Sequence, residues 1–197
     1  ADVTSLRLTA RRDLLAQFDQ QRRLLDESTT ARDLDSYYQR AFDLLSSSST
    51  RGAFDLAAET PRTRERYGRT EFGQRCLLAR RLAEAGVPMV NVSYCHIPRD
   101  SWDTHAQNFK QMKESLGPTF DAAFSALVED LAERGMLAET LVLVNAEFGR
   151  TPAINPRSGR DHYPVSWSMA PCGGGIRGGQ VLGRTSASRM TLEERPV

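Results

Sequence analysis

The sequence has no long apolar run and almost no lysine. No stretch of about 18 or more apolar residues occurs, which excludes a membrane-spanning helix. The net charge is only +1, from 26 basic and 25 acidic residues. Every basic residue is Arg except Lys110 and Lys113, and the arginines are spread along the chain. This balance favours neither a nucleic-acid partner nor another polyanion, because such a surface needs clustered positive charge.

Cysteine is also scarce. The three cysteines, Cys76, Cys95 and Cys172, are widely spaced and form no C-x-x-C pair. This pattern excludes a disulfide framework and a zinc ribbon, and at most one disulfide bond could form. We expect buried free thiols instead.

The composition is that of a globular domain of moderate size. Of the 197 residues, 40% are hydrophobic and 26% are charged, which fits a single domain. The chain begins with Ala1, inside a predicted helix. At the other end, Thr191 and Glu194 form a capping box that would begin a further helix. We therefore expect a fragment of a longer protein.

The N-terminal half is predicted to be helical. Leucine and aromatic residues recur at a helical spacing over residues 5–27 and 31–46, which predicts two amphipathic helices paired as a hairpin. A short helix is expected over 51–58 and a polar loop over 60–68. Residues 71–85 form a third amphipathic pattern, which ends at a glycine suited to a helix C-terminus.

The second half changes to alternating strands and helices. Strands are predicted over 88–95 and 140–145, with weaker ones over 166–170 and 180–182. A helical pattern covers 106–134 and is interrupted at Gly117-Pro118, where the proline suits the first turn of a new helix. Strand, helix and strand in this order form a βαβ unit. The sequence therefore predicts an α/β protein with a mainly parallel sheet flanked by helices.

Polar side chains that could bind a metal follow the predicted strands. In open parallel sheets, ligands bind at the carboxyl ends of the strands, so these side chains are candidates for a common site. They offer only oxygen and imidazole ligands, as Zn²⁺, Mn²⁺ or iron prefer, and no thiolate. The candidate ligands are Asp103, His105, Glu147, Asp161 and His162.

Each acidic candidate has an alternative structural role. Asp103 could cap a helix that begins near residue 106, and Asp161 could pair with a nearby arginine. Of the adjacent Asp161 and His162, one could bind the metal while the other supports it by a hydrogen bond, or the two could bind different metals. Glu147 could form an ion pair with Arg150, because a buried carboxylate needs a partner.

Two arginines are candidates for holding an oxyanion. Arg150 and Arg160 lie in the same polar segments, and a guanidinium fork matches phosphate or sulfate. A structural ion pair is an equally good interpretation for each. The glycines 173–175 lack the Lys-Ser/Thr pair of a phosphate-binding loop, so we expect them to form a turn.

Several strings resemble one known family over essentially the whole chain. They are Tyr67-Gly-Arg-Thr-Glu-Phe-Gly-Gln-Arg-Cys76 with the helix that follows, Trp102-Asp-Thr-His105, Glu147-Phe-Gly-Arg-Thr-Pro152, Gly159-Arg-Asp-His162 and Gly173-Gly-Gly-Ile-Arg-Gly-Gly179. In this order they resemble the DUF1501 family of bacterial proteins, which is related to the alkaline phosphatase and sulfatase superfamily.

The resemblance implies a single alkaline-phosphatase-like domain over 1–197, with a helical insertion at 1–60 and an α/β core at 61–197. It implies that Asp103, His105 and His162 hold one metal. Glu147 takes a ligand place of a second metal, which is left one ligand short. Family members are longer than this chain and carry an export signal, so an exported or periplasmic location is implied.

Two functions follow as expectations. The first is a metal-dependent hydrolase of phosphate or sulfate esters, in which Glu147 ligates or acts as base, and Arg150 or Arg160 holds the oxyanion. Its partner would be a small-molecule or polymer ester, with no nucleic acid and no membrane span. The second is a non-catalytic exported binding or scaffold domain that inherited the fold.

Overall fold

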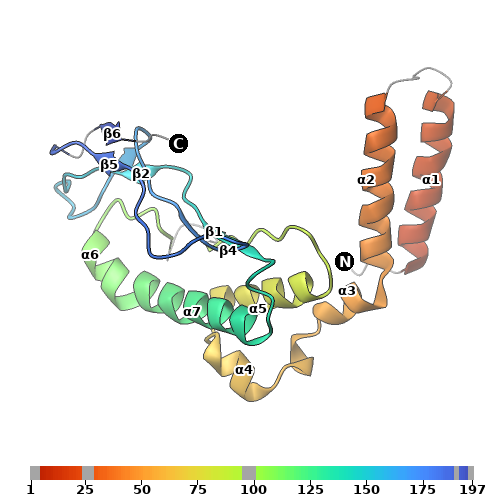
Figure 1. Ribbon diagram of the computed structural model, residues 1–197, viewed down its shortest axis with the longest axis horizontal. Helices are drawn as coiled ribbons and strands as arrows, with labels where there is room; N and C mark the ends of the chain where they lie inside the picture. Colours follow the sequence, from red (N-terminus) through yellow and green to blue (C-terminus); the bar gives the residue numbers. More distant parts are fainter. Residues whose placement is uncertain (1–4, 24–28, 95–100, 189–190, 195–197) are drawn as a thin grey trace.

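The chain combines helices with small antiparallel sheets. A computed structural model describes residues 5–23, 29–94, 101–188 and 191–194. Two N-terminal helices stand apart from the rest of the molecule. In that rest, two further helices lie beneath the strands (Figure 1). The prediction of a mixed helix and strand protein with an N-terminal helical hairpin is confirmed.

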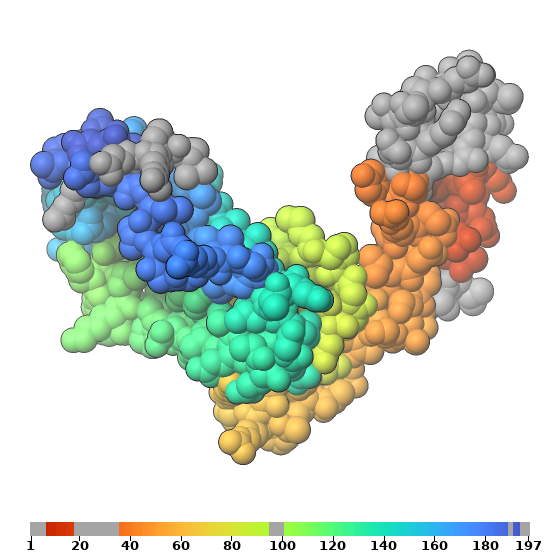
Figure 2. Space-filling model, in the orientation of Figure 1, coloured from red at the N-terminus to blue at the C-terminus, as the bar shows by residue number. Residues whose placement is uncertain are grey.

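The hairpin consists of α1 (Ser5–Arg23) and α2 (Thr29–Ser46), which lie side by side. Its apolar side chains are only partly covered, and Leu14 is 57% and Tyr37 63% exposed. The coloured parts of α1 and α2 form an arm that is separate from the rest in the space-filling view (Figure 2). This arm contributes to an accessible surface of 14526 Å², whereas a compact monomer of this mass exposes roughly 9,300 Å².

Short capped helices connect the arm to the body. They are α3 (Ser48–Ala53), the 3-10 turn η1 (Leu56–Ala58) and α4 (Pro61–Arg66). The loop predicted over 60–68 is wrong, because Thr60 caps α4. Its hydroxyl accepts a hydrogen bond from the Thr63 amide at 3.0 Å, and a proline takes the first helical position. That position suits proline, whose missing N–H needs no partner there.

The core lies between α5 (Glu71–Glu84) and α7 (Gly117–Glu133). The helix predicted over 71–85 is confirmed. Tyr67, Leu77 and Ala123 are completely buried between these helices, and Cys76 lies with them. Burial raises the pKa of the Cys76 thiol to about 12, so it stays protonated and unreactive. Cys95 lies outside the described residues.

The predicted interruption before α7 is confirmed. The helix α6 (Asn108–Gln111) passes into the π turn η2 (Met112–Leu116), and α7 follows with proline in its first turn. A β-carbon on Gly117 would lie 2.5 Å from the carbonyl oxygen of Met112. Only glycine therefore allows the backbone to pass this closely.

The described strands form three antiparallel pairs rather than a parallel sheet. β1 (Leu141–Val144) pairs with β4 (Ala170–Gly173), and β2 (Gly149–Arg150) pairs with β3 (His162–Tyr163). β5 (Arg184–Thr185) pairs with β6 (Leu192–Glu194). The mainly parallel sheet that the sequence predicts is thus not found in this part of the chain.

The reason is that β1 has a different neighbour from the one expected. Residues 88–94 belong to no ladder in the described chain, although the side chains of residues 89–94 alternate between exposed and half-buried. β4 takes the place beside β1 and ends at Gly173, which has a positive φ, as do the next two residues, Gly174 and Gly175. As a result Leu141 is 56% exposed, so β1 is not covered on both faces.

Two weaker expectations near the C-terminus are wrong as well. The strand expected over 166–170 begins only at Ala170, and no strand covers 180–182. The capping box of Thr191 and Glu194 does not begin a helix, because β6 occupies that segment. A capping signal by itself does not decide structure where a strand partner is present.

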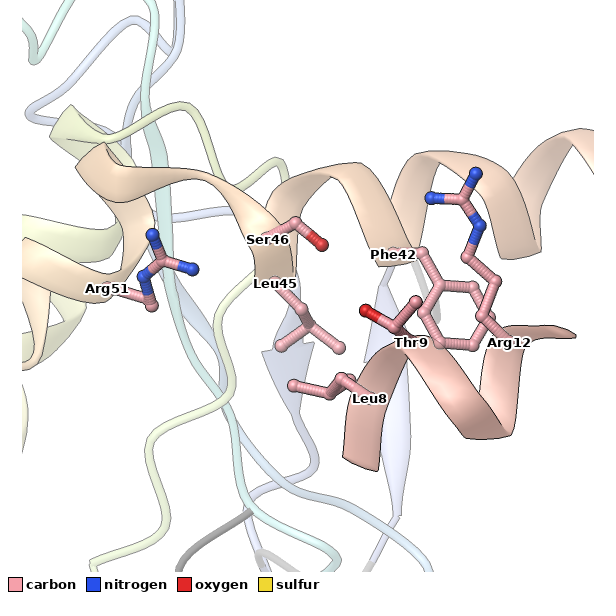
Figure 3. Close-up of a pocket in the computed structure, with 7 residues that line it drawn as sticks. All are labelled: Leu8, Thr9, Arg12, Phe42, Leu45, Ser46 and Arg51. Atoms are coloured by element: carbon pink, nitrogen blue, oxygen red, sulfur yellow. The ribbon is translucent and has the colours of Figure 1, made fainter. Parts of the chain in front are cut away.

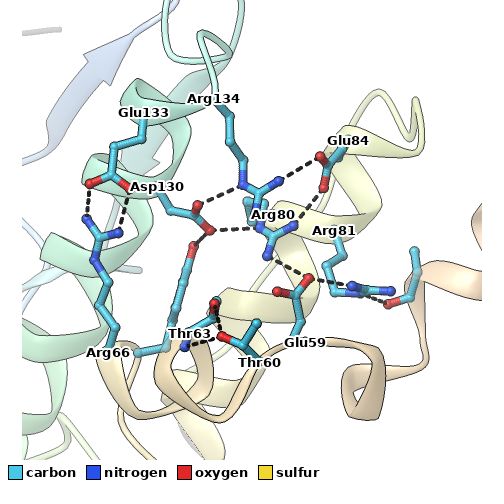
Figure 4. Close-up of polar contacts among 12 residues, drawn as sticks. Glu59, Thr60, Thr63, Arg66, Arg80, Arg81, Glu84, Asp130, Glu133 and Arg134 are labelled. Atoms are coloured by element: carbon cyan, nitrogen blue, oxygen red, sulfur yellow. Dashed lines mark hydrogen bonds and ion pairs between the residues drawn. The ribbon is translucent and has the colours of Figure 1, made fainter.

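A buried ion network joins α5, α7 and the connecting segment (Figure 4). The Arg80 side chain is only 1% exposed, and its Nε lies 2.9 Å from Asp130 Oδ2. Its two terminal nitrogens lie 2.8 Å from Glu59 and 2.6 Å from Glu84. The Tyr67 hydroxyl donates to Asp130 Oδ2 at 2.8 Å. One guanidinium therefore links three segments that are distant in sequence.

This network is expected to make the fold sensitive to acid. Burial would raise the pKa values of Asp130 and Glu59, but hydrogen bonds from arginines and, at Asp130, from Tyr67, together with the charges of the surrounding arginines, outweigh burial and lower both. A carboxyl whose pKa is lowered by folding stabilises the protein at higher pH and loses this contribution on protonation. We expect a melting temperature that is constant between about pH 6 and 8 and falls below about pH 4.

Calorimetry across this pH range would check the expectation. The variant D130N cannot be protonated at this position and should lose less stability between pH 6 and pH 3 than the wild type. An equal loss in both proteins would contradict the role given to Asp130.

Candidate metal centre

Three side chains from two distant segments meet at one end of the body. One ligand atom each from Asp103, His105 and His162 lies within 4.8 Å of the others. Within the described residues, this is the one group of three or more metal-binding side chains at such distances. Of the five candidate ligands that the sequence assigns to a common site, the structure brings these three together as one possible metal site.

The segment around Asp103 and His105 is fixed through the buried residue between them. Thr104 is 2% exposed, and its hydroxyl donates to Asn108 at 2.5 Å. Its carbonyl oxygen accepts a hydrogen bond from the Arg160 amide at 3.0 Å. Because Thr104 is held on both sides, its two neighbours project toward solvent at a fixed place.

A second loop, which contains Asn155 and Arg157, is hydrogen-bonded to the segment that carries His105. The Asn155 side-chain amide donates to the His105 carbonyl oxygen at 3.0 Å, and the Gln107 amide donates to the Arg157 carbonyl at 3.0 Å. A β-carbon on Gly159 would lie 2.1 Å from the carbonyl carbon of His105. Glycine is therefore needed where the two loops touch, as the Gly159-Arg-Asp-His162 string provides.

The pairing of β2 with β3 places His162 opposite Arg150. Both side chains reach the same oxygen, since Asp103 Oδ1 lies 2.8 Å from His162 Nε2 and 2.5 Å from Arg150 Nη2. His105 Nε2 lies 3.5 Å from that oxygen. The His105 and His162 rings are 4.6 Å apart, and Phe148 packs on His162 at 4.4 Å.

Asp103 is held as a carboxylate. The hydrogen bond to His162, and then that from Arg150, lowers the pKa of Asp103 to about 2. The side chains of Asp103, His105 and His162 are 52%, 33% and 48% exposed. The site is therefore charged at neutral pH and open to a ligand from solvent.

The donor set fits a divalent transition metal. One carboxylate oxygen and two imidazole nitrogens are a common combination for zinc, manganese and iron. His162 Nε2 already faces Asp103 Oδ1 at 2.8 Å, so a cation bound by both atoms would take the place of the hydrogen bond between them. Three protein ligands leave positions for water or substrate.

Asp103 does not cap the following helix. α6 begins after Gln107, which has a left-handed backbone conformation, and no side chain caps this helix. The carboxylate bonds with Arg150 and His162 instead. Of the two roles that the sequence left open for Asp103, the helix cap is therefore excluded.

The remaining candidates lie around the triad rather than in it. Glu147 is exposed, and Arg150 pairs with Asp103, which leaves Glu147 without the ion pair considered from the sequence. Asp161 bonds with Asn155 rather than with an arginine. Arg160 donates to the carbonyl oxygens of Thr151 and Pro152, at 2.6 and 3.0 Å.

Two hollows of the molecule lie away from the triad. A cavity of about 190 Å³ lies where α1, α2 and α3 meet (Figure 3). Arg12 and Arg51 contribute its only charged side chains, and no carboxylate or imidazole faces it. Another hollow, of about 290 Å³, separates α5 from residues 90–93. Neither contains a general base, so the triad is the stronger candidate for chemistry.

Sequence reasoning missed the residues that support the site and the core. Arg80 and Asp130 occupy positions on the apolar faces of their helices, next to Leu77 and Leu131, and this placement was a signal for a buried ion pair. Asn155 carried no comparable signal. Its role depends on a contact with His105 that lies 50 residues away in sequence.

The fold and this site define a mixed helix and strand protein with an exposed Asp-His-His cluster beside an arginine. None of the helices in the described ranges has the length and apolarity needed to cross a membrane. A family described as "Protein of unknown function (DUF1501)" matches residues 1–197, and the chain belongs to this family. No curated protein and no solved structure matches it.

Proposed function

We propose that this protein is a divalent-metal-dependent hydrolase of phosphate or sulfate esters, of the alkaline phosphatase and sulfatase type. The observation that carries the proposal is the triad of Asp103, His105 and His162 with Arg150 directly beside it. A cation site next to a guanidinium suits a substrate that carries a negatively charged oxyanion. The export that the family resemblance implies belongs to the same proposal.

In this proposal the triad and Arg150 have different roles. Asp103, His105 and His162 hold the cation, which when bound supplies Lewis-acid stabilisation of negative charge. Arg150 holds an oxygen of the ester through its fork. Its Nη1 makes only a long contact of 3.4 Å to the Arg160 carbonyl, so this end of the fork can turn to a substrate.

Arg160 has a different part in the proposal. Its Nη1 is already bonded to two carbonyl oxygens, and its guanidinium lies 5.8 Å from the Phe109 ring centre. It therefore shapes the loop that carries His162, while Arg150 contacts the oxyanion. Glu147 is close in sequence to Arg150 and exposed, which suits a base near the site better than a ligand in it.

One observation favours a non-catalytic binding or scaffold domain. Glu147 lies outside the triad, and the described part of the chain contains no second cluster that could hold another metal. A site with a single cation and no assigned nucleophile could bind an anion without cleaving it. Turnover decides between these two functions.

The test is hydrolysis of p-nitrophenyl phosphate and p-nitrophenyl sulfate with Zn²⁺ or Mn²⁺ present. We expect turnover that disappears with a chelator and returns with added metal. R150A should lower kcat/KM about 100-fold, as removal of an oxyanion donor does, and R150K should recover part of it because the charge remains. Metal binding without turnover of either ester would support the binding domain instead.

A further inference from the structure

We propose that Asp161 is a positioning residue that orients His105 for metal binding. The inference rests on the metal site of the proposed function. The two ring nitrogens of His105 face two different carboxylates. Nε2 lies 3.5 Å from Asp103 Oδ1, inside the triad, and Nδ1 lies 3.8 Å from Asp161 Oδ1, outside it.

The Nδ1 atom of His105 needs a partner. It is buried, and within the described structure it has no hydrogen-bond partner. A buried polar atom without a partner costs free energy. Asp161 Oδ1 is the carboxylate oxygen that faces it, and an approach of about 1 Å would give a hydrogen bond of ordinary length.

Asp161 is itself firmly held at this place. Its Oδ1 accepts a hydrogen bond from the Asn155 side-chain amide at 2.9 Å, and the same amide nitrogen donates to the His105 carbonyl at 3.0 Å. The Asp161 backbone is tied to Thr151, with hydrogen bonds of 3.0 and 3.1 Å. The amide of Asn155 thus links the backbone of His105 to the carboxylate that faces its ring.

The arrangement fixes which nitrogen of His105 is free to bind a cation. A carboxylate that accepts a hydrogen bond from Nδ1–H selects the tautomer whose Nε2 has an unshared electron pair, and it makes that nitrogen more basic. In His105 this is the nitrogen that faces Asp103. The carboxylate of Asp161 is not part of the triad, so it acts through His105 instead of touching the cation.

The first readout is the tautomer of His105 in the metal-free protein. The chain has only three histidines, so ¹⁵N-imidazole NMR spectra contain three ring systems, assigned by H105Q and H162Q. We expect the Nδ1–H form at His105 in the wild type, loss of this preference in D161A, and its retention in D161N, whose amide oxygen can still accept the hydrogen bond from Nδ1–H.

The second readout is affinity for Zn²⁺, measured by competition with a chromophoric chelator. D161A should bind about 10- to 100-fold more weakly, as is usual when the partner of a metal-bound histidine is removed. D161N should lie between D161A and the wild type. D13A removes one exposed carboxylate from the distant α1 and should leave the affinity unchanged.

The outcomes separate this inference from the proposed function. If the wild type binds no Zn²⁺, the proposed metal site is wrong. If the wild type binds Zn²⁺, and D161A keeps the Nδ1–H tautomer of His105 and a Zn²⁺ affinity within twofold of the wild type, Asp161 has no positioning role. The metal site itself is then still supported. A change in only one of the two readouts also contradicts the inference. If D161A does not fold by circular dichroism, D161N decides by the same criteria.

Discussion

Replacing His105 and His162 together by alanine is expected to abolish metal binding. The change removes both nitrogen ligands and leaves Asp103, whose Oδ1 is also bonded to Arg150 at 2.5 Å. A single exposed carboxylate that is neutralised by a guanidinium does not hold a divalent cation at micromolar concentration. After loading with Zn²⁺ or Mn²⁺ and dialysis, elemental analysis should show bound metal in the wild type and none in the double variant.

The matched control is E147Q. The sequence pointed to Glu147 as a further ligand, whereas the structure places it outside the triad. E147Q should therefore retain the metal content of the wild type. Equal metal in the double histidine variant and the wild type would remove the proposed site, and loss of metal in E147Q would show that the ligand set is wrong.

Replacing Arg80 by alanine is expected to destabilise the fold strongly, by about 3–5 kcal/mol. The side chain is 1% exposed and neutralises Asp130 and Glu59, whose side chains are 7% and 9% exposed. Without Arg80, both carboxylates keep their burial but lose one of their cations. Urea unfolding followed by circular dichroism measures the loss in free energy of unfolding.

Two further variants show what causes this loss. R80M keeps most of the side-chain volume but not the charge, so a loss close to that of R80A would assign the effect to charge instead of packing. R69A breaks an exposed ion pair with Glu65, which is four residues away in sequence, as Glu84 is from Arg80. This change should lower the free energy of unfolding by at most about 0.5 kcal/mol. A loss below about 1 kcal/mol in R80A would contradict a central role for the network.

The helices were predictable because their signals are local. Residues 71–85 show apolar side chains at helical spacing and a terminal glycine, and α5 ends within one residue of that prediction. Pro118 marked the start of α7 because proline is compatible only with the first turn of a helix. The prediction of a loop before α5 was wrong, because Thr60 was not recognised as the N-terminal cap of the helix α4.

The strand partners were not predictable in the same way. The apolar pattern of residues 140–145 predicts a strand, and β1 is present there. A strand pattern indicates that a segment needs a neighbouring strand for its backbone hydrogen bonds. It does not indicate which segment is that neighbour. The pairing of β1 with β4 joins segments about 30 residues apart and makes the pair antiparallel, which no local pattern contains.

Residue types and their spacing were sufficient to predict the longer helices, the family and Asp103, His105 and His162 as candidate ligands, but not the short helix α4. The three-dimensional arrangement was needed to show that Arg150 bonds to Asp103, that Glu147 lies outside the triad and that Asp161 faces Nδ1 of His105. These relations depend on how two loops dock through Asn155 and Gly159. Such contacts between distant segments are set by packing and backbone hydrogen bonds.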